Sequence, residues 1–168
     1  MEICKELKYN FDIGRDQQIN RNLMERNMLQ YFNEFYMTDD QTIIRDKYHD
    51  IYQLLKKAYW AKDRSELVTQ KAISNSLNYA IFEVDSERLV GFARVITDYS
   101  TVYYLSDVYI DEEFRGRGLG KKIVEWIVLH EDKLSGINGL LKTKDAVNLY
   151  KKYGFEECKA VCMVRIND

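Results

Sequence analysis

One short segment of the chain combines closely spaced glycines with positive charge. Residues 115–121 read RGRGLGK and lie between a strand-like and a helix-like stretch. Glycine lets the backbone approach a ligand and adopt dihedral angles that other residues avoid. The first N–H groups of a helix lack partners within the helix, and together with the helix dipole they attract an anion. We therefore expect a diphosphate site formed by Arg115, Gly116, Arg117, Gly118, Leu119, Gly120 and Lys121.

The glycine spacing excludes two common nucleotide-binding motifs. The dinucleotide fingerprint requires GxGxxG, whereas this chain has GxGxG. A Walker A motif would require a glycine at Arg115 and a serine or threonine at Lys122. Two interpretations stay open beside the diphosphate site: an arginine–glycine recognition or localisation segment, and a glycine-rich turn that binds nothing. The four cations within residues 115–122, and the position between a strand and a helix, favour the diphosphate.

A second segment, residues 145–155, makes a family resemblance recognisable. It reads DAVNLYKKYGF and matches the pattern A-x-x-L-Y-x-K-x-G-F, while residues 115–120 match Arg-x-x-Gly-x-Gly. In this order, after an extended strand, the two motifs resemble those of the GNAT N-acetyltransferase superfamily, over about residues 44–166. The resemblance implies an α/β (α+β) fold in which helices flank a mixed, mostly antiparallel, twisted central sheet. It also implies acetyl-CoA as the co-substrate.

The resemblance assigns further parts of a binding site. It implies that the backbone of Val108, Tyr109 and Ile110 pairs with the pantetheine arm, and that an N–H group there polarises the thioester carbonyl. Thr143 stands where the family often has an asparagine that contacts the pantetheine, so we include Thr143 among the cofactor-binding residues. The sequence shows no Ser/His/Asp or Cys/His arrangement. We therefore expect direct attack by the amine rather than an acyl-enzyme.

Acetyl transfer to an amine needs an acid and a base. Tyr150 stands at the tyrosine of the second motif, and a phenol with a pKa near 10 is protonated at neutral pH. We assign Tyr150 as the acid that protonates the leaving thiolate, with simple packing in its helix as the alternative. Asp107 is the candidate base, because it lies on the strand that should border the acetyl group. Glu83, Asp98, a water relay and a purely structural Asp107 are the alternatives.

The acceptor side of the site involves aromatic residues. Tyr59, Trp60 and Arg64 form a Tyr-Trp-x-x-x-Arg cluster that resembles a bacterial GNAT subgroup of unassigned substrate. These side chains suit an acceptor with an aromatic or carboxylate part, and core aromatics beside a surface arginine are the alternative. The expected function is acetyl transfer from acetyl-CoA to a primary amine of a small molecule or protein. The rival function is a non-catalytic acyl-CoA sensor or partner-binding module.

The composition is that of an ordinary globular chain and excludes several classes. Of the 168 residues, 46% are apolar and 31% are charged, and the length suits one domain. A net charge of −2 argues against a nucleic-acid partner, and no apolar run approaches the roughly 20 residues of a membrane span. Three cysteines and two histidines form no zinc pattern, so we expect no metal. Without a secretion signal we expect a cytoplasmic protein with no membrane partner, and a homodimer stays open.

Apolar periodicity predicts the elements that carry these residues. A helical extension over residues 1–43, with a helix over 17–37, precedes the acetyltransferase domain over residues 44–168. We expect further helices over 46–61, 65–76, 119–130 and 145–153, and strands over 78–84, 89–97, 101–110, 139–142 and 155–166. This order predicts a mixed sheet with helices packed on it.

Overall fold

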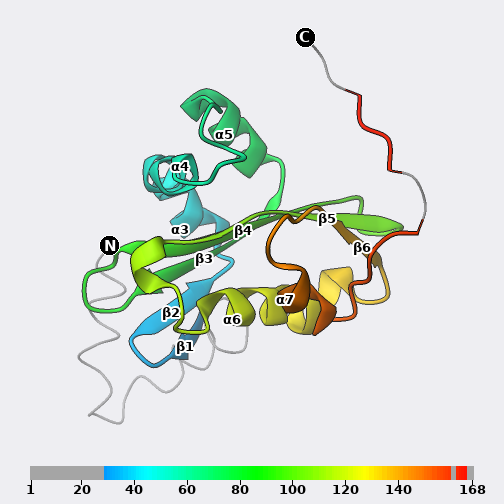
Figure 1. Ribbon diagram of the computed structural model, residues 1–168. Helices are drawn as coiled ribbons and strands as arrows, with labels where there is room; N and C mark the ends of the chain where they lie inside the picture. The colour runs from blue at the N-terminus through cyan, green and yellow to red at the C-terminus, as the bar shows by residue number, and fades with distance from the viewer. Residues whose placement is uncertain (1–28, 160–161, 166–168) are drawn as a thin grey trace.

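The computed structural model describes residues 29–159 and 162–165, which form one sheet with helices on both faces (Figure 1). The order of the strands in the sheet is β1-β2-β3-β4-β5-β6. The strands are β1 (Leu29–Phe32), β2 (Phe35–Thr38), β3 (Leu77–Glu83), β4 (Leu89–Thr97), β5 (Val102–Ile110) and β6 (Asn138–Leu141). All neighbours are antiparallel except β5 and β6, which are parallel. The mixed, mostly antiparallel sheet predicted from the sequence is confirmed.

Figure 1 shows the helices divided between the two faces of the sheet. The helices α3 (Gln41–Asp46), α4 (Tyr48–Lys56) and α5 (Glu66–Ser74) lie on one face. The other face carries α6 (Leu119–Glu125), which continues into the π-helical turn η3 (Trp126–His130), and α7 (Val147–Lys151). Two short 3-10 helices, η2 (Glu112–Phe114) and η4 (Asp132–Leu134), complete the described elements. No helix in the described ranges is both long and apolar enough to cross a membrane.

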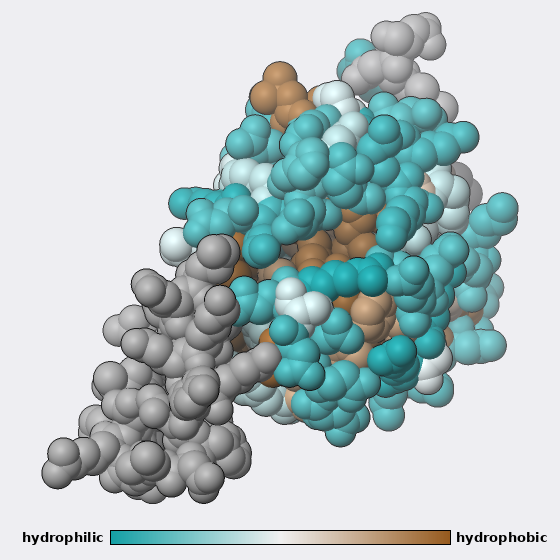
Figure 2. Space-filling model, turned by 90° about the vertical axis from the view of Figure 1, so that its left-hand side faces the viewer, coloured by the Kyte–Doolittle hydropathy of each residue, from teal (hydrophilic) through white to brown (hydrophobic). Residues whose placement is uncertain are grey.

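An apolar core lies on each face of the sheet. Along β3, Tyr79 and Ile81 join the cluster around α6, while Ala80 and Phe82 join the cluster around α4, because successive side chains of a strand point to opposite faces. Figure 2 shows one face of the molecule, on which polar residues dominate and apolar side chains are visible mainly in the hollow across the middle. Because an apolar core covers each face of the sheet, β4 and β5 are held by packing on both sides.

The N-terminal part of the described chain differs from the prediction. Residues 29–38 form the hairpin of β1 and β2, and the helix predicted over 17–37 is wrong there; residues 1–28 lie outside the described part. Asn33 occupies the turn with a φ of 50°, a conformation that asparagine tolerates. All four residues of β2 are buried, and β2 pairs with β3, so its aromatic residues serve both faces of the main sheet. A domain boundary at residue 43 therefore does not separate residues 29–43 from the sheet.

Other predicted elements hold with changed limits. The helix predicted over 46–61 corresponds to α4, which begins after Lys47 and ends at Lys56, whereas α3 before it was not predicted. Asp63 and Ser65 were both candidates for the N-cap of α5, and the structure selects Ser65, whose Oγ accepts a hydrogen bond of 3.3 Å from the Val68 N–H. The strand predicted over 155–166 is absent from residues 155–159 and 162–165. Phe155 packs against the Tyr150 ring, but residues 156–159 and 162–165 are exposed and pair with no strand of the described chain.

Candidate active site

A cleft opens where β5 and β6 separate. The two strands pair over only four residues each, from Val102 with Asn138 to Leu105 with Leu141. Beyond this point lies a cavity of about 560 Å³, which we call the aromatic-side cavity; its lining includes Tyr59, Trp60, Tyr104, Ser106, Asp107, Lys142, Thr143 and Lys144. A second cavity of about 730 Å³, the loop-side cavity, runs along β5 to the glycine loop (residues 115–120). The two cavities share Tyr59, Trp60, Val108, Asp145, Ala146 and Tyr150, so they form one cleft.

The glycine loop faces the loop-side cavity with its backbone. Gly116 and Gly118 have φ angles of 80° and 81°, in the left-handed region that favours glycine. A Cβ atom added to either residue would meet no atom within 4 Å, so conformation, rather than crowding, requires glycine there. Gly118 is the N-cap of α6, which starts at Leu119. The first N–H groups of α6 and the loop therefore border the cavity, as the diphosphate site requires.

The cations of the glycine loop do not all reach the cleft. Arg115 lines the loop-side cavity; its guanidinium lies 5.4 Å from the centre of the Tyr109 ring, and its Nε donates a hydrogen bond of 3.3 Å to the Ile110 carbonyl. Arg117 instead pairs with Glu34 at 3.2 Å and lies over aromatic rings of the α6-side core. Neither Arg117 nor Lys121 is among the residues that line either cavity.

Tyr150 lies at the junction of the two cavities. It comes from α7, is 8% exposed, and packs edge-on against Phe155 with the ring centres 5.9 Å apart. Burial, and to a lesser extent the charge of Asp145, raises the pKa of Tyr150 to about 12. The phenol is therefore protonated at neutral pH, and it can donate a proton to a group bound at the junction.

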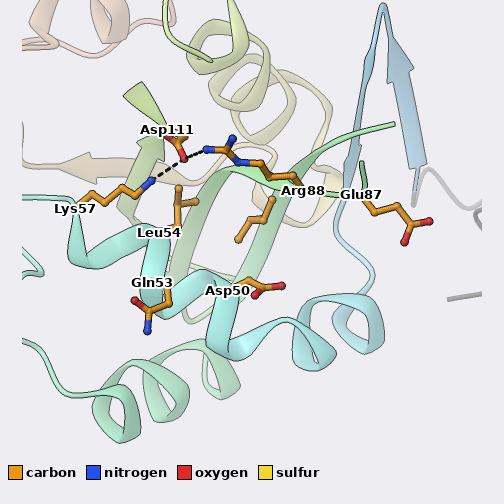
Figure 3. A pocket seen from close by; sticks show the side chains of 8 residues that line it. Asp50, Gln53, Leu54, Lys57, Glu87, Arg88 and Asp111 are labelled. Atoms are coloured by element: carbon orange, nitrogen blue, oxygen red, sulfur yellow. Dashed lines mark hydrogen bonds and ion pairs between the residues drawn. The ribbon is translucent and has the colours of Figure 1, made fainter. Parts of the chain in front are cut away.

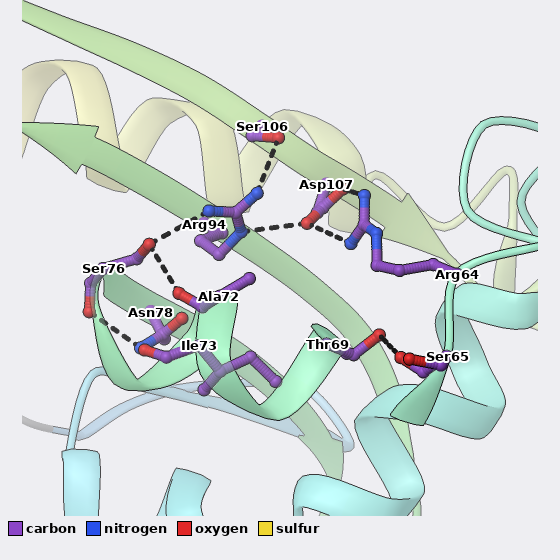
Figure 4. A network of polar contacts seen from close by, with 10 residues as sticks. All are labelled: Arg64, Ser65, Thr69, Ala72, Ile73, Ser76, Asn78, Arg94, Ser106 and Asp107. Carbon is purple, nitrogen blue, oxygen red and sulfur yellow. Dashed lines mark hydrogen bonds and ion pairs between the residues drawn. The ribbon is translucent and has the colours of Figure 1, made fainter. Parts of the chain in front are cut away.

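Asp107 lies at a bulge in β5. Arg94 of β4 pairs with Ser106 and Phe92 pairs with Tyr109, so two residues of β5 oppose one residue of β4. Asp107 has a φ of 54°, and its side chain is 1% exposed. Its carboxylate accepts hydrogen bonds from Nη1 and Nη2 of Arg64 at 2.9 and 3.0 Å, and from Nε of Arg94 at 2.9 Å (Figure 4).

This geometry argues against Asp107 as the general base. Burial opposes its ionisation, but the hydrogen bonds and charges of Arg64 and Arg94 prevail and hold the pKa of Asp107 below its ordinary value. Both carboxylate oxygens are occupied, and a carboxylate with a lowered pKa is a weak base. For the same reason Arg64, predicted to bind the acceptor, is engaged by Asp107 and does not line the aromatic-side cavity.

The other acidic candidates lie elsewhere. Glu83 accepts a hydrogen bond from Ser86 in the turn after β3. In the turn before β5, Asp98 accepts hydrogen bonds from the Thr101 hydroxyl and from backbone N–H groups including that of Ser100, and these bonds lower its pKa. Asp145, which the sequence analysis did not single out, lines both cavities. Its position, directly before the Ala146 that opens the second motif, was the available signal.

Aromatic side chains form the wall of the cleft opposite α7. Tyr59 and Trp60 contact each other edge-on, with the ring centres 4.8 Å apart, and Trp60 also packs against Tyr109. Lys144, which follows β6, places its ammonium 5.7 Å from the centre of the Tyr59 ring and so reaches the opposite wall. Thr143 lines the aromatic-side cavity, and its Oγ1 accepts a hydrogen bond of 3.0 Å from the Ala146 N–H. Of the predicted acceptor residues, the structure brings Tyr59 and Trp60 to the cleft.

A second buried aspartate lies at the end of β5 (Figure 3). Lys57 and Arg88 both donate hydrogen bonds of 2.9 Å to Oδ2 of Asp111, and Arg88 also pairs with Glu113. Although burial opposes ionisation, the bonds from Lys57 and Arg88 lower the pKa of Asp111. The small cavity beside this cluster, about 250 Å³, carries acidic and basic groups that compensate one another. The cluster joins α4 and the β3–β4 turn to the end of β5.

Comparisons with known proteins agree with this fold and cleft. A family model described as a GNAT acetyltransferase domain matches residues 75–157. A crystal structure of a putative GNAT-family acetyltransferase from Xanthomonas campestris pv. campestris is 32% identical, with a TM-score of 0.69 over 81% of this chain and 96% of that chain.

Two curated relatives are N-acetyltransferases by name. The uncharacterised N-acetyltransferase ycf52 of Pyropia yezoensis is 28% identical over 74% of this chain and 71% of its own length. The chloroplastic GCN5-related N-acetyltransferase 2 of Arabidopsis thaliana is 30% identical over 61% of this chain and 40% of its own length. The fold, the family model and these relatives together show that the chain belongs to the GNAT family and is an N-acetyltransferase.

Proposed function

We propose that the protein transfers the acetyl group of acetyl-CoA directly to a primary amine bound in the aromatic-side cavity. The observation that carries this proposal is the position of Tyr150, which lines both cavities of the cleft. The glycine loop lies at one end of that cleft, and the rings of Tyr59 and Trp60 line it between the two cavities. A thioester held at the junction would meet the acceptor from one side and the phenol from the other.

The residues of the loop-side cavity fit acetyl-CoA. Past Leu105, no strand of the described chain pairs with the edge of β5 that faces the cleft, so backbone groups of Val108–Ile110 on this edge are available to a pantetheine arm. The hydroxyl of Tyr109 is buried and has no hydrogen-bond partner within the described ranges, which leaves a polar atom at this wall for a ligand. The glycine loop and Arg115 would hold the diphosphate.

Two residues of the chain carry the two proton transfers of the reaction, Tyr150 at the leaving thiolate and Asp145 at the amine. The neutral amine attacks the thioester carbonyl, a backbone N–H of the β5 bulge region stabilises the developing oxyanion, and the carbon–sulfur bond breaks. The Tyr150 hydroxyl protonates the leaving thiolate. The amine gives up its proton to Asp145, directly or through water, since Asp145 is an acidic side chain that lines both cavities and Asp107 is held by arginines.

The lining of the aromatic-side cavity indicates a class of acceptor. The rings of Tyr59 and Trp60 offer apolar and cation–π contacts, while Lys142 and Lys144 supply positive charge. Because Arg64 is engaged by Asp107, these two lysines take over the role that the sequence suggested for Arg64. An amine that also carries an aromatic or an anionic part fits this lining best.

A screen of thiol release from acetyl-CoA tests the proposal. The panel contains polyamines, amino acids, aminoglycosides and peptide N-termini, and the expected result is turnover with amines that bear a carboxylate or a ring. Replacing Lys142 and Lys144 together by glutamine should raise KM for an anionic amine more than for an uncharged one. Binding of acetyl-CoA without turnover of any amine would refute the transfer reaction and support the acyl-CoA-binding module.

A further inference from the structure

The two arginines that hold the buried carboxylate of Asp107 have no part in the chemistry described so far. We propose that Arg64 and Arg94 are positioning residues, which act through Asp107 to fix the bulge of β5 and to join the acceptor loop (residues 57–64) to the acyl-binding strand. This inference rests on the proposed function, because it concerns how the two sides of the transfer site are aligned.

The bulge decides which way the side chains of β5 point. Before it, Tyr103 and Leu105 belong to the core around α6. After it, Val108 and Ile110 pack toward that core, and Tyr109 joins the core around α4. The extra residue thus reverses the odd–even alternation, as a shift of one residue must. The conformation of Asp107 therefore sets the orientation of the residues that line the loop-side cavity.

That conformation needs support from elsewhere. A φ of 54° is unfavourable for residues other than glycine, although aspartate and asparagine tolerate it better than most. A buried carboxylate also requires charged partners with good geometry. Arg94 meets this need from β4: its Nε binds Asp107, its Nη1 donates to Ser76 Oγ at 3.0 Å, and its Nη2 donates to Ser106 Oγ at 3.3 Å (Figure 4). The guanidinium is fixed on three sides.

Arg64 connects the same carboxylate to the acceptor loop. Its two-pronged contact with Asp107 holds the end of the loop, whose earlier residues Tyr59 and Trp60 line the cleft. Two tight turns hold Tyr59 and Trp60 in a fixed position relative to Arg64. In these turns the Arg64 N–H donates to the Ala61 carbonyl at 3.0 Å, and the Ala61 N–H donates to the Ala58 carbonyl at 3.0 Å. One ion-pair cluster therefore aligns the aromatic wall with the strand that would polarise the thioester.

Four variants separate positioning from a general contribution to stability. Asp107→Gly keeps the left-handed conformation accessible but removes the carboxylate, and Arg64→Met releases the acceptor loop while Arg94 still pairs with Asp107. Arg64→Lys keeps the charge without the two-pronged geometry. Arg88→Met is the matched control, because it removes one of two cations from the other buried aspartate, Asp111.

Two measurements do not depend on knowing the acceptor. Acrylamide quenching of tryptophan fluorescence reports on Trp60, which is 42% exposed, because the other tryptophan, Trp126, is 2% exposed. Hydrogen exchange of the peptide that covers residues 105–110 reports on the bulge. We expect Arg64→Met to increase the quenching and Asp107→Gly to increase both signals, while Arg88→Met lowers the melting temperature without changing either signal.

Kinetics with an amine identified by the screen complete the test. Misalignment should lower kcat in Asp107→Gly and Arg64→Met by about 10- to 100-fold, with partial recovery of kcat in Arg64→Lys. The calorimetric affinity for CoA should stay near that of the wild type in Arg64→Met, because the bulge keeps its contact with Arg94 there. Quenching and exchange no larger than in Arg88→Met would overturn the inference, even if no amine is acetylated. Conversely, increased quenching in Arg64→Met without any turnover of the wild type would support the alignment and refute only the transfer reaction.

Discussion

Replacing Tyr150 by phenylalanine removes one oxygen atom from the junction of the two cavities. The ring still packs against Phe155, and the side chain is 8% exposed, so folding and the affinity for acetyl-CoA should change little. Loss of a general acid lowers kcat by about 10²–10⁴-fold, which corresponds to about 3–5 kcal/mol of transition-state stabilisation. We expect a loss in this range.

The pH profile adds a second, independent expectation. Because burial and Asp145 raise the pKa of Tyr150 to about 12, the phenol keeps its proton well above neutral pH. Any fall of kcat on the alkaline side below about pH 10 must then come from another group. The wild-type profile should therefore show no loss of activity from deprotonation of Tyr150 in that range.

The assay is thiol release under conditions in which chemistry limits the rate, shown by a burst-free time course. Tyr153→Phe is the matched control, since Tyr153 follows α7 closely and its hydroxyl donates to the Lys121 carbonyl at 3.1 Å, away from the cleft lining. The control should keep wild-type turnover. Full wild-type turnover of Tyr150→Phe under the same conditions would refute the assignment of Tyr150 as the acid.

Three further predictions follow from the geometry of the site. Gly118→Val should weaken acetyl-CoA binding about tenfold or more in calorimetry, because a side chain destabilises the binding conformation of the loop, with its φ of 81°, by about 1–2 kcal/mol. Gly136→Val is the control: it is strained in the same way, at a φ of 73°, but lies outside the cleft lining, so the affinity should not change. Asp145→Asn should lower kcat by about 10²-fold if Asp145 takes the amine's proton, and an unchanged kcat assigns this step to water alone. The pKa of Asp107 is lower in the folded than in the unfolded state, so its ion pairs stabilise the fold above the unfolded pKa near 3.9. This stabilisation is lost as the pH falls through the lowered folded-state pKa. Denaturant titrations should therefore show that the difference in unfolding free energy between the wild type and Asp107→Asn shrinks below about pH 4.

The parts of the site that depend on short motifs could be predicted from the sequence. The positive φ angles of Gly116 and Gly118 follow from glycine spacing, and the position of Tyr150 in the cleft agrees with its motif. The limits of β4 and most of β5 follow from their runs of β-branched and aromatic residues.

The role of Asp107 could not be predicted in this way, because it depends on partners distant in the sequence. Arg64 is 43 residues away and Arg94 is 13 residues away. The change from odd apolar positions, Tyr103 and Leu105, to even ones, Val108 and Ile110, was a usable sign of the bulge.

The hairpin of β1 and β2 was misassigned for a different reason. Its aromatic residues recur at spacings of three and four, as in an amphipathic helix, yet in the structure they fill both faces of a sheet. Periodicity alone cannot distinguish a short strand buried on both faces from part of a buried helix. Pairing with β3, which lies about 40 residues later in the sequence, decides the outcome.

Past Leu105, the cleft-facing edge of β5 pairs with no strand among the residues that the structure describes, and this has a consequence for the protein without ligand. An unpaired strand edge can recruit strands of other molecules and so promotes aggregation. Here the edge lies inside a cleft lined by residues of α7 and the acceptor loop, which restrict the access of a foreign strand. A ligand that pairs with this edge binds the folded state only, and it therefore raises the apparent melting temperature with concentration by mass action. Purification and storage with CoA should consequently suppress aggregation as well as heat denaturation.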